Sequence, residues 1–235
     1  MDSSHWPTTH TRASCRSLDN WGTATTRITI CTGFRLRRSH VLHAQCGRKL
    51  ISRQTHPAAA ILERCVFRSR TQDVYLIADA YREREIEKAI ADFFEAAAGS
   101  NALATISFSD TTAGRDPKIP AGGGADLVAY VGHDGLMDFQ LTRPPVNHNR
   151  SARPAIILAC ASRYYFSEAL RASGAYPLLW TTNLMAPEAY TLEVALSAWI
   201  RGESDGEIPE RAAAACARYQ KCSLVAARKL FATGC

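Results

Sequence analysis

Two residues whose types together perform nucleophilic catalysis stand directly after apolar runs of this chain. His133 follows the run LVAYVG, and Cys160 follows the run AIILA. A free cysteine has a pKa of about 8.5, so a neighbouring imidazole is needed to make its thiolate abundant at neutral pH. Such a thiolate attacks a carbonyl carbon. We expect backbone N–H groups at Asp134, Gly135 and Cys160 to hold the resulting oxyanion.

Each of these residues also has an ordinary structural interpretation. A cysteine at the end of a buried strand commonly serves as a small apolar residue, and a histidine after a strand is often only solvated. Both occur here at matching strand ends, with Gly135 two residues beyond His133. The combination favours a catalytic pair of His133 and Cys160.

The elements that must position this pair are short apolar runs. The runs 127–132, 155–159 and 178–182 are apolar without alternation, and two further candidate strands cover 74–79 and 104–108. Strands buried on both faces have this pattern, which is typical of a parallel sheet. Neighbouring strands lie about 4.8 Å apart, and side chains beyond their carboxyl ends share one edge of the sheet.

Helical patterns alternate with these runs. Apolar residues recur at three-to-four spacing over 83–98, and further helices are predicted over 164–172, 187–201 and 208–231. Strands alternating with helices indicate an α/β fold. We therefore predict a three-layer α/β/α sandwich with a mostly parallel sheet.

The charge of the chain divides it into two parts. Residues 1–72 carry 12 Lys and Arg against 3 Asp and Glu, whereas residues 73–235 carry 16 against 19. The first part also lacks an apolar run with a clear period, which predicts a poorly ordered basic N-terminal extension over 1–72 and a folded domain over 73–235. A nucleic-acid-binding arm and an organelle transit peptide are the alternatives for the first part.

Several function classes lack support in the sequence. No stretch approaches the roughly 20 apolar residues of a membrane span, and no secretory hydrophobic region stands near the start. The cysteines form no C-x-x-C pair, and the run Gly122–Gly124 lacks the lysine of a phosphate-binding loop. We expect a cytoplasmic protein with reduced thiols, without a cofactor, metal or membrane partner, and do not expect nucleic acid as its partner.

The chain resembles the caspase-like cysteine peptidases, which include caspases, legumains, gingipains, separases and the CHAT module. In that family an apolar strand runs into His-Gly, and a later apolar strand runs into Ala-Cys or Gly-Cys. The corresponding blocks here are LVAYVGHDG and AIILACAS, and the later segment GAYPLLWTTNLMAPEAYTLEVALSAWIRG is similar to the CHAT stretch. The resemblance covers roughly residues 73–202.

This resemblance implies a caspase-hemoglobinase-like fold and a cysteine endopeptidase that acts through an acyl-enzyme. His133 would be the general base or orienting imidazole, and Cys160 the nucleophile. The substrate would be a polypeptide, or the domain would bind a protein partner. The chain departs from the family where Asp134 replaces the usual glycine, and only 27 residues separate His133 from Cys160.

Two alternatives remain open from the residues. Four carboxylates near predicted strand ends could bind Mg²⁺, as in phosphoryl-transfer and receiver-type domains, namely Asp79, Asp110, Asp134 and Asp138. A non-catalytic binding or scaffold module on the same fold is the other alternative, because fold does not imply activity.

Overall fold

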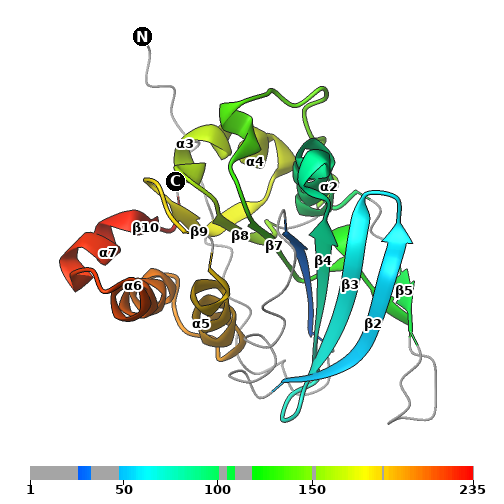
Figure 1. The fold of residues 1–235 in the computed structure, drawn as a ribbon, viewed down its shortest axis with the longest axis horizontal. Helices are drawn as coiled ribbons and strands as arrows, with labels where there is room; N and C mark the ends of the chain where they lie inside the picture. Colours follow the sequence, from blue (N-terminus) through cyan, green and yellow to red (C-terminus); the bar gives the residue numbers. More distant parts are fainter. Residues whose placement is uncertain are drawn as a thin grey trace.

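An eight-stranded sheet with the order β10-β9-β8-β7-β1-β4-β3-β2 runs through the molecule (Figure 1). The computed structural model describes residues 26–32, 48–100, 105–108, 118–149, 152–186 and 188–234. The strands of this sheet are β1 (Thr26–Thr32), β2 (Arg48–Ala58), β3 (Ile61–Ser69), β4 (Val74–Tyr81), β7 (Leu127–Val131), β8 (Pro154–Leu158), β9 (Tyr176–Thr181) and β10 (Phe231–Ala232).

The sheet is parallel in its middle and antiparallel at both sides. The pairs β4–β1, β1–β7, β7–β8 and β8–β9 are parallel, whereas β10 runs antiparallel to β9 and the β2–β3 hairpin runs antiparallel to β4. All residues of β4 and β7 are buried. The α/β class with a mostly parallel sheet, predicted from apolar runs without alternation, is confirmed.

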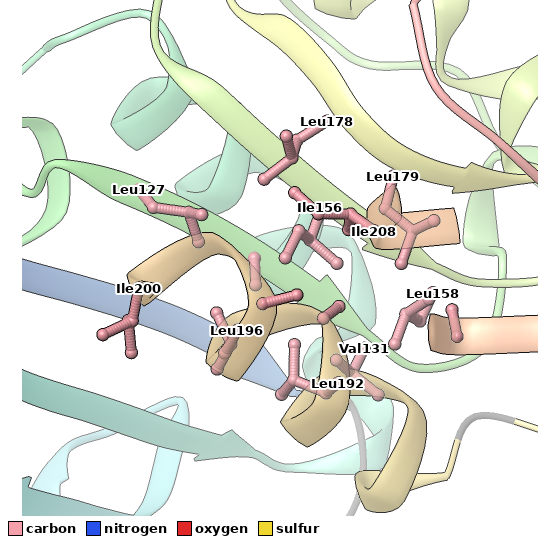
Figure 2. Packing of buried hydrophobic residues seen from close by; sticks show 14 of the residues in the cluster. Leu127, Val131, Ile156, Leu158, Leu178, Leu179, Leu192, Leu196, Ile200 and Ile208 are labelled. Carbon is pink, nitrogen blue, oxygen red and sulfur yellow. The ribbon is translucent and has the colours of Figure 1, made fainter. Parts of the chain in front are cut away.

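Helices pack against both faces of the sheet. On one face, α2 (Ile86–Ala97) and α4 (Ser167–Ser173) share a buried cluster with side chains of β7 and β8. On the other face lie α5 (Ala189–Ile200), α6 (Glu207–Gln220) and α7 (Leu224–Leu230). Figure 2 shows this second cluster, in which Leu192 and Leu196 of α5 lie against the side chains of β7 and β8.

The predicted strand over 104–108 lies outside the main sheet. It forms β5 (Thr105–Ser107), which pairs antiparallel with β6 (Lys118–Pro120) in a separate two-stranded sheet. Ile106 and Ile119 are buried against a cluster that includes Ile77 of β4. The neighbours of Ile106 within β5 are exposed, so this strand buries one face only.

Two predicted helices are each divided. The helix expected over 208–231 is broken at Lys221, which has a left-handed backbone with φ of 56°, and α7 then begins after Ser223, whose side chain accepts from the N–H of Ala226. The helix expected over 164–172 begins earlier as the short helix α3 (Ser162–Tyr165), and α4 continues from Ser167. A short 3₁₀ turn, η2 (Glu83–Glu85), precedes α2.

The boundary predicted at residue 72 is corrected by β1, β2 and β3. Residues 48–69 are not a poorly ordered extension but a hairpin of the same sheet, and β1 lies between β4 and β7. Two arginines of this region pair with acids of the later chain: Arg48 pairs with Glu193 of α5, and Arg64 pairs with Asp79 of β4. The remainder of the predicted extension, 1–25 and 33–47, lies outside the described residues.

Within the described ranges, none of the helices has both the length and the apolar character needed to cross a membrane.

Candidate functional site

His133 and Cys160 emerge from the same edge of the sheet. β7 and β8 are neighbours, with Val131 in register with Leu158, and the N–H of Gly132 donates to the carbonyl oxygen of Leu158 at 3.1 Å. Each of the two residues lies two positions beyond this registered pair. The strands that precede them are thus neighbours, which a catalytic pair of His133 and Cys160 requires, and both residues follow carboxyl ends of parallel strands.

The thiol of Cys160 lies against the segment that follows β9. Its Sγ is 3.5 Å from the backbone nitrogen of Met185, which donates to it, and 3.5 Å from the carbonyl oxygen of the same residue. The side chain is half-buried. The backbone N–H and carbonyl groups of Met185 thus orient the thiol. The sequence did not indicate this contact, which joins residues 25 positions apart.

The backbone turns sharply directly after Cys160. Ala161 adopts a left-handed conformation with φ of 47° and ψ of 33°, which is rare for a residue with a Cβ. Its N–H donates to the carbonyl oxygen of Asn183 at 2.9 Å. Such strained conformations cost on the order of 1–3 kcal/mol and persist where surrounding contacts hold them.

Two fully buried hydroxyl groups supply those contacts. The Oγ of Ser162 donates to the carbonyl oxygen of Ile157 at 2.9 Å and accepts from the N–H of Thr181 at 3.0 Å. The Oγ1 of Thr181 accepts from the N–H of Ser162 at 3.2 Å and donates to the carbonyl oxygen of Ala159. The network joins the ends of β8 and β9, so the position of Cys160 is held by residues that sequence reasoning missed.

The imidazole of His133 is oriented by a carboxylate. Its Nε2 lies 2.9 Å from Oδ2 of Asp138, and both side chains are exposed. With Asp138 accepting from Nε2, the proton is on that nitrogen and Nδ1 becomes the basic one. The sequence analysis named Asp138 only as a possible Mg²⁺ ligand. Its position five residues after His133 was the available sign that the two side chains could meet.

The loop after His133 is built around Asp134. This fully buried residue precedes the 3₁₀ turn η4 (Gly135–Met137), and its Oδ1 accepts from the N–H of Leu136 at 3.0 Å. Its Oδ2 accepts no hydrogen bond from any residue that the structure describes. Burial raises the pKa of the Asp134 carboxyl to about 6. Its side chain thus caps a turn and is shielded from solvent.

The oxyanion role predicted for Gly135 meets a competing contact. The N–H of Gly135 donates to the carbonyl oxygen of His133 at 3.1 Å, so an oxyanion would have to displace that bond. A glycine is required here because a Cβ would lie 2.5 Å from the ring of Phe139. The N–H groups of Asp134 and Cys160 are the other predicted donors.

Replacing the buried carboxyl of Asp134 tests whether its raised pKa affects the stability of the fold. The folded pKa of about 6 lies above the ordinary value of 3.8, so Asp134 lowers the free energy of unfolding as pH rises between these two values. Asp134→Asn keeps a capping side chain and is expected to increase the free energy of unfolding at pH 7.5 by about 2–3 kcal/mol, with little change at pH 4. Urea unfolding of both proteins at the two pH values measures the difference, and a gain independent of pH would contradict the explanation.

The magnesium alternative receives no support from the described residues. Asp79 accepts a bidentate ion pair from Arg64, with both N–O distances at 2.6 Å, and its strand is separated from β7 by β1. Asp110 lies outside the described residues. Elsewhere in the described ranges, no group of three or more His, Cys, Asp or Glu residues could hold a metal ion.

Comparisons of the chain with protein-family models, with curated proteins and with solved structures found no match. The function proposed below rests on the geometry at the ends of β7 and β8.

Proposed function

We propose that the protein is a cysteine-type endopeptidase in which His133 and Cys160 act as a pair. The observation that carries this proposal is the registered pairing of Val131 with Leu158, because it brings the two strand ends that bear the pair to one edge of the sheet. The left-handed turn at Ala161, held by buried hydroxyl groups, adds support, since strained backbone clusters at functional sites.

The proposed reaction has two halves. The imidazole of His133 takes the proton of the Cys160 thiol, and the thiolate attacks the carbonyl carbon of a peptide bond. The C–N bond then breaks, and the imidazolium gives its proton to the leaving amine, which leaves a thioester on Sγ. Water hydrolyses the thioester, releases the carboxylic acid and restores the thiol. Asp138 would stabilise the imidazolium by accepting from its Nε2–H.

The proposal extends to a caspase-like three-layer α/β/α sandwich. Buried clusters on opposite faces of the sheet, one with α2 and α4 and the other with α5 and α6, support the layered arrangement. The motifs LVAYVGHDG and AIILACAS, which end the neighbouring strands β7 and β8, support the family resemblance.

A non-catalytic binding module is the second candidate. It is favoured by contacts that already occupy groups the reaction would use: Met185 binds the Cys160 thiol through its backbone, and the N–H of Gly135, a predicted oxyanion donor, donates to the backbone carbonyl oxygen of His133. In such a module the same edge would bind a polypeptide without cleaving it.

The pH dependence of alkylation of Cys160 in the full chain tests the pair. At pH 6.5 we expect iodoacetamide to label Cys160 roughly five to ten times faster than the exposed Cys222, since a paired thiolate is far more abundant but somewhat less nucleophilic. His133→Ala should remove this advantage, whereas the matched variant His148→Ala, at the other exposed histidine of the 118–149 range, should keep it.

Three outcomes separate the candidates. Equal labelling of Cys160 and Cys222 at pH 6.5 in all three proteins would refute the pair. An advantage that depends on His133, together with cleavage in a peptide-library screen, would support the peptidase. The same advantage without cleavage would favour the binding module.

A further inference from the structure

Exposed apolar side chains stand shortly after the carboxyl ends of β7, β8 and β9. Among the described residues, seven large hydrophobic side chains are exposed, and three of them lie within six residues of these strand ends: Met137, Tyr164 and Leu184. The three strands lie side by side in the sheet (Figure 1). Apolar side chains exposed together at one place commonly mark an interaction site.

Tyr164 and Leu184 are each linked to the nucleophile through the backbone. Leu184 is 69% exposed and stands next to Met185, whose backbone binds the Cys160 thiol. Tyr164 is 79% exposed, and its N–H donates at 2.8 Å to the carbonyl oxygen of Ala161, the residue after Cys160. Both side chains are therefore attached to segments that contact or adjoin the thiol.

The ring of Tyr164 contacts the ring of its neighbour. It packs edge-on against the ring of Tyr165, with the ring centroids 4.9 Å apart, and Tyr165 packs against the buried cluster of α2 and α4. An aromatic side chain has only two rotatable side-chain angles, so ordering it on binding costs little conformational entropy.

Met137 adjoins a residue that contacts the other member of the pair, His133. Its side chain is 44% exposed, and it stands next to Asp138, whose carboxylate contacts His133. Two charged groups beside these residues have partners within the chain. Asp138 pairs with His133, and the guanidinium of Arg163 lies 6.0 Å from the centre of the Trp180 ring. Apolar contact is thus what Met137, Tyr164 and Leu184 offer a ligand.

We infer that these three residues form an apolar recognition surface for substrate polypeptides that carry a large aliphatic or aromatic side chain beside the scissile peptide bond. This inference rests on the proposed function and names the substrate class for the same site. A charged side chain at that position would gain little from the surface and would lose hydration there. The surface spans the loops of both members of the pair, as an extended substrate crossing Cys160 would require.

Alkylating reagents that share one reacting group but differ in their arm test the surface separately from the pair. Iodoacetamide, its N-phenethyl derivative and its N-carboxyethyl derivative are compared on the full chain at pH 9, where thiols ionise without a base. The rate at Cys160 is measured by peptide mass spectrometry and divided by the rate with free cysteine. We expect the phenethyl reagent to exceed iodoacetamide about tenfold in this ratio, and the carboxyethyl reagent to show no gain.

Substitutions at Tyr164 and Leu184 test whether these two side chains cause the preference for the phenethyl reagent. Tyr164→Ser and Leu184→Ser should each reduce the phenethyl preference about threefold, and the double variant should bring it close to one. Val225→Ser is the matched control, since this side chain is 63% exposed on α7, and it should retain the full preference.

The outcomes distinguish the two ideas. A phenethyl ratio near one in the full chain, or an unchanged preference in the double variant, would overturn the apolar surface even if Cys160 is reactive at pH 6.5. A preference that the double variant removes would support the surface even if slow labelling at pH 6.5 refutes the catalytic pair.

Discussion

Removal of residues 1–72 is expected to abolish cooperative folding of the remaining chain. β1 pairs with β4 through seven registered residues and with β7 through five, so it fills the middle of the parallel sheet. Without it, two fully buried strands would each expose an unpaired edge, and the polar groups of their backbones would lose their partners. Circular dichroism and urea unfolding of the 73–235 fragment measure the loss.

A shorter truncation provides the control. A chain that starts at Thr26 keeps β1, β2 and β3 and is expected to unfold cooperatively. If the 73–235 fragment unfolded with the same midpoint and slope as this control, the central position of β1 would be unnecessary for the fold. Aggregation of the fragment alone would agree with the expectation, because exposed strand edges pair between molecules.

Arg48→Ala is expected to reduce the free energy of unfolding by about 3–5 kcal/mol, because it leaves the buried carboxylate of Glu193 without its counter-charge. The two side chains are only 4% and 8% exposed, and they join the first residue of β2 to α5. The remaining hydrogen bond from Ser197, at 2.7 Å, would not neutralise the charge of Glu193. Urea denaturation at pH 7 measures the change.

An exposed ion pair serves as the matched control. Arg228 and Glu210 are 51% and 52% exposed, so Arg228→Ala should lower the free energy of unfolding by less than about 1 kcal/mol. The double variant Arg48→Met with Glu193→Leu should recover most of the loss, because apolar side chains replace both buried charges. Similar losses in Arg48→Ala and Arg228→Ala would contradict the argument that burial makes the first pair important.

The sequence by itself determined four of the five strands in the parallel part of the sheet, all except β1, and the place of the candidate pair. Strands β4, β7, β8 and β9 are runs of apolar residues, a pattern typical of strands buried on both faces of a sheet. Because His133 and Cys160 directly follow two such runs, their location beyond the carboxyl ends was predictable. These inferences needed only local composition and the general rules of parallel sheets.

Only the tertiary structure shows that segments before residue 73 form strands of the sheet. The hairpin of β2 and β3 has register shifts between Leu50 and Ser52 and between Thr55 and Ala58, so no single two-residue period runs through it. Arg48 and Arg64 are accommodated within it because Glu193 and Asp79 meet them from distant parts of the chain. A window of sequence contains the charge of these arginines but not the partner that makes their burial possible.

The surroundings of the pair were likewise decided only by the fold. Met185 meets Cys160 across 25 residues, and Thr181 meets Ser162 across 19, because β8 and β9 end side by side. The break at Lys221 occurs without a glycine, so the last predicted helix gave no sign of its division. Local periodicity specifies which segments become strands and helices, whereas contacts between segments depend on which elements become neighbours, and that is settled by packing of the whole core.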